Sequence, residues 1–153
     1  MSGEPQATPA LQAAARRRRE LRDALVTFED ALSSPVRDRV TWRAEVADAL
    51  EALDLAFRDH VAETEAAGGL YEEMRDSAPH VGAKARRLRE EHPVMQAALA
   101  DALSRLVVPP PDDAAAGTAR DELQLLMGRI VRHRQHGADL VWEAYAIDIG
   151  DAG

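Results

Sequence analysis

Cysteine is absent from this chain of 153 residues, and aromatic residues make up only 4% of it. Without thiols the chain forms neither disulfide bonds nor thiolate metal sites, so any metal would have to be held by imidazole and carboxylate groups. Hydrophobic residues still account for 46% of the sequence, which leaves leucine, valine and alanine to build the core. A composition of this kind is typical of helical proteins.

The sequence also lacks an excess of positive charge and any long apolar segment. Its net charge is −8, which argues against a nucleic-acid binder, because such proteins need a basic face for phosphates. We interpret the one basic run, Arg16 to Arg19, as a solvated helix face. No apolar run approaches the roughly 20 residues that cross a bilayer, and residues 1–9 contain no hydrophobic signal core. We therefore expect no membrane partner and a cytoplasmic location.

Four segments repeat apolar residues at helical spacing, and no segment alternates as a strand does. The long helices are predicted over residues 11–32, 37–66, 77–106 and 118–147, after a disordered tail over residues 1–10. Ser77 is the expected N-cap of the third, one or two helical turns precede it over residues 70–76, and a proline-rich linker covers residues 108–117. We predict an all-α, up-down-up-down four-helix bundle over residues 11–150.

Three histidines, His60, His92 and His133, each lie in the middle of an apolar stripe on a different predicted helix. A buried imidazole needs partners for both ring nitrogens, and a metal ion between the helices would supply one to all three rings. For one histidine alone, a core residue bonded to protein groups or water is the ordinary explanation, but three together favour the metal. His92 and His133 have similar depths along the bundle, whereas His80 is an alternative neighbour for His60.

Helical geometry sorts the other polar residues, at about 100° of rotation per residue. Glu63, His136 and Glu143 lie at the rims of the inward faces and are secondary candidates for metal ligands. Glu91 is displaced sideways from His92, and Glu65 points away from the core unless the helix unwinds before Gly68 and Gly69. Imidazole and carboxylate ligands suit iron, manganese or zinc.

Three short stretches resemble bacterial hemerythrin-like (HHE cation-binding) domain proteins. They are His60 to Glu65 ahead of Gly69-Leu70-Tyr71, Arg89 to His92, and Arg132 to Leu140, and the resemblance spans residues 15–148. It implies a four-helix bundle with a non-haem di-iron site built from histidines and carboxylates. The implied function is the handling of O2, NO or iron by reversible binding more than by turnover.

The ligand set diverges from the pattern of that family. The family usually has a carboxylate one turn after the histidine of its second and fourth helices, where this chain has Thr64 and Gly137. The family's first-helix histidine is also missing, and Glu20 is the nearest carboxylate at a plausible depth. One iron ion, two ions and a vestigial site therefore all remain open.

The alternative function is that of a metal-free helical bundle acting as a protein-interaction module. A di-iron oxidase is not favoured, because such sites use Glu-x-x-His motifs and this chain contains none. We therefore expect a binding protein rather than an enzyme.

Overall fold

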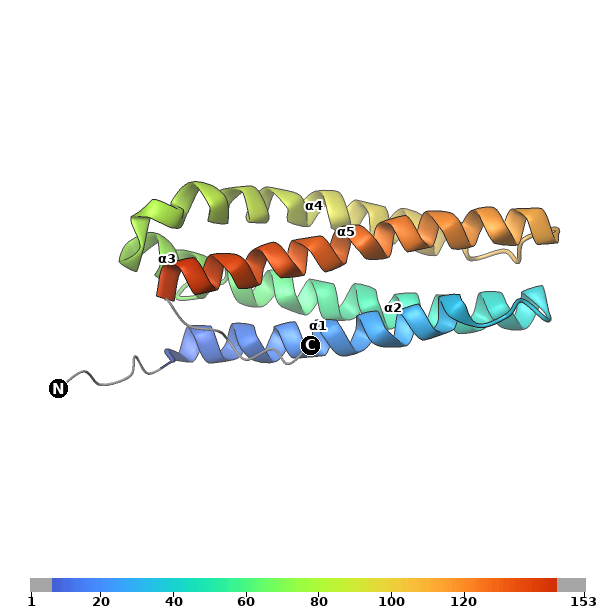
Figure 1. The fold of residues 1–153 in the computed structure, drawn as a ribbon, viewed down its shortest axis with the longest axis horizontal. Helices are drawn as coiled ribbons and strands as arrows, with labels where there is room; N and C mark the ends of the chain where they lie inside the picture. The colour runs from blue at the N-terminus through green and yellow to red at the C-terminus, as the bar shows by residue number, and fades with distance from the viewer. Residues whose placement is uncertain (1–6, 146–153) are drawn as a thin grey trace.

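The computed structural model describes residues 7–145, which form helices and turns and contain no strand. The elements are α1 (Pro9–Ser33), α2 (Arg39–Glu65), α3 (Leu70–Ser77), the 3₁₀ turn η1 (Pro79–Val81), α4 (Gly82–Arg105) and α5 (Asp113–Tyr145). Both α1 and α4 contact α2 and α5, so the four long helices surround a common core. Successive long helices run in opposite directions (Figure 1), in agreement with the predicted up-down-up-down order. The prediction of an all-α fold is confirmed.

The first long helix begins earlier than the sequence pattern indicates. Thr8 is its N-cap, and the Thr8 hydroxyl accepts a hydrogen bond from the backbone N–H of Leu11 (3.1 Å). This bond satisfies one of the amides that have no partner inside the helix. Pro9 and Ala10 are therefore helical, although they fall in the predicted disordered tail. Residues 1–6 of that predicted tail lie outside the described residues, as does the predicted helical end after Tyr145.

The last helix also begins early, so the predicted linker over residues 108–117 is too long. Asp112 accepts a hydrogen bond from the backbone N–H of Ala115 (2.8 Å), and α5 starts at Asp113. The alanines that follow are the strongest helix formers, and they continue the helix once its first turn is capped. The irregular connection is thereby limited to the proline-rich segment before Asp112.

Two glycines turn the chain from α2 into α3. Gly68 has a φ of +73°, which glycine adopts without steric cost. A Cβ atom on Gly69 would lie 2.6 Å from the carbonyl oxygen of Glu63, so the close approach of the chain here requires glycine. The predicted short helix is α3. The predicted N-cap role of Ser77 is wrong: this residue ends α3, and Pro79 then opens the 3₁₀ turn before α4.

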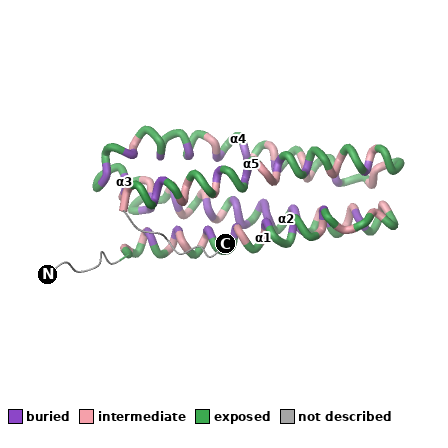
Figure 2. The backbone as a smooth tube through the Cα atoms, in the orientation of Figure 1, coloured by how far each residue is buried: buried purple, intermediate pink, exposed green. Residues whose placement is uncertain are grey.

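Buried apolar residues form two separate clusters along the bundle axis. Figure 2 shows buried positions on the sides that the helices turn toward one another. The larger distal cluster lies toward the α1–α2 and α4–α5 connections, and its members include Phe28, Leu50, Phe57, Leu99 and Ile130. The smaller proximal cluster lies beside α3, and its members include Leu11, Leu70, Met74, Leu88 and Leu140. Within residues 7–145, no helix is long and apolar enough to cross a membrane.

A polar layer lies between the two clusters, and each long helix contributes a buried arginine or histidine to it. Its members are Arg18 on α1, His60 on α2, His92 on α4 and His133 on α5. Arg18 is only 5% exposed, so the interpretation of the whole arginine run as a solvated face is wrong at this position. The reason is its spacing: Arg18 falls four residues after buried Ala14 and three before buried Leu21, on the inward face of α1.

Candidate metal centre

The rings of His60, His92 and His133 converge on one point in the polar layer. The Nε2 atom of His133 lies 3.2 Å from Nε2 of His60 and 3.2 Å from Nε2 of His92. One ligand atom from each ring lies within 4.8 Å of the other two, an arrangement that no other set of described histidines and carboxylates repeats. The predicted proximity of His92 and His133 is confirmed. His92, rather than the exposed His80, is the α4-side neighbour of His60, with ring centroids 5.2 Å apart.

These separations suit a shared metal ion. Two nitrogen ligands at 2.0–2.2 Å from one ion lie about 2.8–3.6 Å apart at tetrahedral or octahedral angles. The two Nε2 separations that involve His133 both fall inside that interval. The third pair, His60 and His92, has ligand atoms within 4.8 Å of each other, so the three imidazoles together could hold one metal ion.

Carboxylates hold two of the rings from the outside. Nδ1–H of His92 donates to Glu65 (2.7 Å), and Nδ1–H of His133 donates to Glu91 (3.0 Å). Arg89 donates to the second oxygen of Glu65 (2.8 Å). The expectation that Glu65 points away is wrong, because this residue ends α2 where α4 passes and its side chain reaches across to α4. Carboxylate partners of this kind orient metal-binding histidines and raise their basicity.

These outer bonds determine what the inner nitrogens can do. A carboxylate accepts only, so the neutral rings of His92 and His133 carry their proton on Nδ1 and present a lone pair at Nε2. The two lone pairs face each other at 3.2 Å, and neither nitrogen can donate to the other. Nε2 of His92 can accept from the Tyr71 hydroxyl (3.2 Å) and Nε2 of His133 from an Nε2–H of His60 (3.2 Å), and a metal ion at the meeting point of the three rings could take up these lone pairs instead.

Protonation of the rings is disfavoured. Burial lowers the pKa of His92 and of His133, although their carboxylate partners oppose this shift. Burial lowers the pKa of His60 well below its usual value, and the positive charges of neighbouring groups, including Arg18, lower it further. Nδ1 of His60 is buried and has no hydrogen-bond partner among the described residues. A metal ion, which accepts lone pairs, therefore suits the site better than added protons.

Two aromatic side chains enclose the cluster. The Phe57 ring lies 5.7–5.8 Å from the centroids of all three imidazoles. Tyr71, from α3, stacks on His92, and its hydroxyl lies 3.2 Å from Nε2 of His92. Burial raises the pKa of Tyr71 above its usual value, so the hydroxyl keeps its proton and can donate. Tyr71 is therefore part of the surroundings of the cluster.

The structure does not bring the secondary candidates Glu63, His136 and Glu143 into the cluster. Glu63 is half-buried, whereas His136 and Glu143 are exposed. The last two line a surface groove of about 410 Å³ together with Glu91, which stands between that groove and His133. Glu143 also accepts a hydrogen bond from Lys84 (2.7 Å). Rim positions on these long helices face solvent because the inward positions alone fill the narrow bundle centre.

A small cavity adjoins the histidines on the side of α1 and α3. It offers about 20 Å³ to the centre of a water molecule, enough for one or two molecules of that size. Its lining includes two histidines of the cluster, the hydroxyl-bearing Thr64 and Tyr71, and Gly137, which adds no side chain. The Thr64 hydroxyl donates to the carbonyl oxygen of His60 (2.8 Å). Thr64 and Gly137, at the positions of the family's carboxylates, supply no metal ligand, which favours one metal ion over two.

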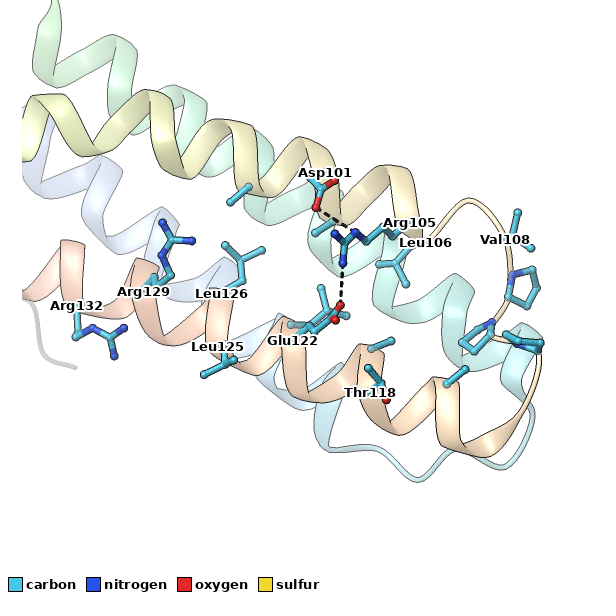
Figure 3. Close-up of a pocket in the computed structure, with 18 residues that line it drawn as sticks. Asp101, Arg105, Leu106, Val108, Thr118, Glu122, Leu125, Leu126, Arg129 and Arg132 are labelled. Carbon is cyan, nitrogen blue, oxygen red and sulfur yellow. Dashed lines mark hydrogen bonds and ion pairs between the residues drawn. The ribbon is translucent and has the colours of Figure 1, made fainter.

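A much larger groove lies elsewhere. A groove of about 980 Å³ runs between the C-terminal half of α4 and the N-terminal half of α5 (Figure 3). Arg105 bridges it by pairing with Asp101 (3.1 Å) on α4 and Glu122 (3.0 Å) on α5. The groove is lined by no histidine, so size does not identify the metal site in this molecule.

Four residues at the site were not identified from the sequence as part of it: Arg18, Glu65, Tyr71 and Glu91. The inward spacing of Arg18 was visible in the sequence, and only its position in a basic run concealed it. Each of the two glutamates bonds a histidine on a neighbouring helix. The periodicity of the helix that carries the glutamate does not predict such a contact. Tyr71 depends on the turn at Gly68 and Gly69, which no pattern of spacing describes.

No known protein family, curated protein or solved structure matches the chain. The chemistry of the site therefore has to be judged from its own geometry. Three histidine ligands with a free fourth position are the arrangement of metal sites that bind or activate a small molecule, whereas purely structural sites fill all four positions with protein.

Proposed function

We propose that this protein is a hemerythrin-like bundle that holds one non-haem iron ion with His60, His92 and His133 and handles O2 or NO by reversible binding. The observation that carries the proposal is the convergence of three Nε2 atoms whose outer nitrogens are, in two cases, held by carboxylates. A bound ion would supply an open coordination position to the small ligand.

The surrounding residues have distinct roles in this proposal. Glu65 and Glu91 orient His92 and His133 and keep their Nε2 lone pairs directed inward. Phe57 covers the three rings and excludes water from that side, which strengthens electrostatic interactions within the site. The Tyr71 hydroxyl, which bonds Nε2 of His92, becomes free to donate elsewhere once that lone pair is used.

Iron is proposed over other metals because of the resemblance to hemerythrin-like proteins. Imidazole ligands on their own also suit zinc, copper and nickel. The small ligand is proposed to be diatomic because the cavity beside the histidines holds one or two water-sized molecules. A larger substrate would need the proximal cluster to open.

The test is to purify the protein without a histidine tag, add ferrous iron under anaerobic conditions, remove the excess and measure the iron bound per chain. We expect one ion per chain and a change in the visible spectrum on addition of NO or air. A variant that replaces the exposed His80 and His136 with alanine is the matched control, and it should bind iron as the wild type does.

Two other outcomes are informative. Two ions per chain would contradict the single-metal site. Failure to retain iron, manganese or zinc at neutral pH would contradict metal binding altogether and support the metal-free interaction module.

A further inference from the structure

We propose that the groove between α4 and α5 binds a long-chain carboxylate, with the carboxylate group at Arg129 and Arg132 and the acyl chain along the groove. No histidine lines this groove, and binding there requires no metal ion. The inference is therefore independent of the proposed function. It assigns a class of ligand to a second site in the molecule.

The first observation is the size of the groove and the apolar character of its walls. Its volume of about 980 Å³ lies at the upper end of the range for small-molecule sites. Leu106, Leu123 and Leu126 belong to the distal cluster and also line the groove. Small side chains leave room between the two helices, namely Ala98 and Ala102 on α4 and Ala115 and Ala119 on α5. The groove therefore offers a ligand an apolar surface that is continuous with the core.

The second observation is the length of the groove. Arg129 and Ala115 both line it, and they lie about 21 Å apart along α5 at 1.5 Å per residue. An extended acyl chain of about 16 carbons has a similar length, given ordinary C–C bonds. The groove follows the two helices (Figure 3), so one extended chain can lie along it.

The third observation is the distribution of charge along the groove. Asp101 and Glu122 are the only carboxylates among the described residues that line it, and Arg105 pairs with both (3.1 and 3.0 Å). Arg129 and Arg132 have no hydrogen bond or ion pair with any described residue. Figure 3 shows both at the end of the groove away from the α4–α5 connection. Two unpaired cations at one end of an apolar groove are complementary to an anion with an apolar tail.

The surroundings of these two arginines also favour an anion. They line an adjoining cavity of about 490 Å³, whose other charged or titratable lining residues are Arg87, Glu90, Glu91 and His136. The three arginines outnumber the two glutamates, and Glu91 already accepts a hydrogen bond from His133 (3.0 Å). Exposed ion pairs are individually weak, so the acyl chain should supply most of the affinity and the arginines should select the charged head group.

Gly128 gives the Arg132 side chain its direction. A Cβ atom on Gly128, four residues earlier in α5, would lie 3.6 Å from Nη1 of Arg132. The guanidinium group therefore lies back along α5, toward the part of the helix that lines the groove. There it can meet a carboxylate with two parallel N–H donors, which is the preferred geometry of this pair.

The experiment measures the binding of cis-parinaric acid, a long-chain carboxylate that fluoresces more strongly in apolar surroundings, to the full-length protein. Its methyl ester has the same chain without the charge. The acid should bind at least about fivefold more tightly than the ester, and palmitate should displace it. Arg129→Gln combined with Arg132→Gln should weaken binding of the acid by about five- to thirtyfold and leave the ester unchanged. Arg16→Gln combined with Arg19→Gln removes the same charge from exposed positions of α1, so this control should bind as the wild type does.

A second variant tests the path of the acyl chain. Ala102→Leu combined with Ala119→Leu fills the groove from both helices and adds apolar surface at the same time. It should weaken the binding of acid and ester alike by at least about tenfold, because less of the chain can be buried. Adsorption to apolar surface in general would instead be unchanged or stronger. Circular dichroism checks that this variant folds, and the arginine variant tests the proposal without it.

Two results would overturn the proposal. One is equal affinity for the acid and the ester, or equal affinity for the acid in the wild type and the folded Arg129→Gln, Arg132→Gln variant. The other is a wild-type dimer, detected by light scattering, that dissociates when the groove is filled by the two leucines. Such a dimer would show that a second copy of the chain covers the groove.

Discussion

The distal cluster and the polar layer are built on the same four helices. The side chains of the distal cluster all pack against apolar neighbours, whereas the polar layer contains a buried nitrogen without a hydrogen-bond partner among the described residues. In the distal cluster, Phe28, Leu50 and Leu99 are fully buried among other apolar groups. In the polar layer, Nδ1 of His60 is buried without a hydrogen-bond partner among the described residues. A buried polar group without a hydrogen-bond partner lowers the free energy of unfolding, so the polar layer stabilises the fold less than the distal cluster does.

This contrast suggests how the bundle tolerates its site. The helices are long, and apolar contacts on both sides of the layer hold the backbone whatever the layer contains. Residues that break the rules of core packing are expected where function requires them. The distal cluster should therefore govern folding, and the polar layer should govern what the protein binds.

The largest effect on stability should come from the distal cluster. Leu50→Ala removes a fully buried side chain and should lower the free energy of unfolding by about 2–5 kcal/mol, as measured by urea denaturation. Leu55→Ala, on the exposed face of the same helix, should change it by at most about 0.5 kcal/mol. Folded Leu50→Ala protein should still take up one metal ion per chain, and loss of metal uptake would undermine the separation of the two regions.

Removing one histidine should abolish the stabilisation that metal provides. A ligand at a hundredfold excess over its Kd stabilises the folded state by about 2.7 kcal/mol. His60→Leu should lose this gain, so its melting temperature should respond neither to added iron nor to chelator. The metal-free variant should be at least as stable as the metal-free wild type, because the replaced ring has a buried nitrogen without a partner. A strongly destabilised metal-free variant would show that His60 has a structural role.

The outer carboxylates should have a smaller effect. Glu65→Gln and Glu91→Gln keep a hydrogen-bond acceptor beside each ring but remove its charge, and each should weaken metal binding by about 10–100-fold. Glu90→Gln, at the exposed position next to Glu91 in α4, is the matched control for competition titrations with a chelator. Equal affinities in all three variants would mean that these carboxylates do not tune the site.

Acidification should give the smallest difference. Burial holds the pKa of His60 well below its usual value of 6.5, so below that pH the unfolded chain takes up a proton that the folded chain refuses. The free energy of unfolding of the metal-free protein should therefore fall as the pH drops below 6.5 and be insensitive to His60 above it. The wild type should lose at most about 1.4 kcal/mol per pH unit more than His60→Leu. Urea denaturation at pH 7.5 and 5.5 measures this difference, and equal losses in both proteins would contradict the neutral, buried state of His60.

The fold could be predicted from the sequence because helical periodicity is a local property. Leu21, Leu25 and Phe28 mark the inward face of α1 by spacing alone, and His60, His92 and His133 share such faces on their own helices. The helix ends were less predictable, since the cap at Asp112 competes with the irregular segment before it. The proximity of His92 and His133 followed from their inward positions and comparable depths, whereas the position of His60 beside them depends on the segment between α2 and α4.

The surroundings of the histidines could not be predicted in the same way. Glu65 and Glu91 each cross to a neighbouring helix, and Tyr71 arrives from α3 through the turn at Gly68. Such contacts depend on how one helix is shifted and rotated against another, which the spacing within one helix does not contain. Glu63, His136 and Glu143 were predicted from their rim positions, but the structure leaves them outside the cluster. The spacing within one helix does not show whether a rim position faces a neighbouring helix or solvent.

The central claim is that His60, His92 and His133 bind one metal ion together. X-ray absorption at the iron edge tests it directly, because imidazole rings bound to a metal give a distinct multiple-scattering pattern. The iron-loaded wild type should show three imidazole nitrogens at about 2.0–2.2 Å, and His60→Leu loaded at high iron concentration should show two at most. A wild-type spectrum without imidazole scattering, or with the same imidazole count in both proteins, would contradict the claim.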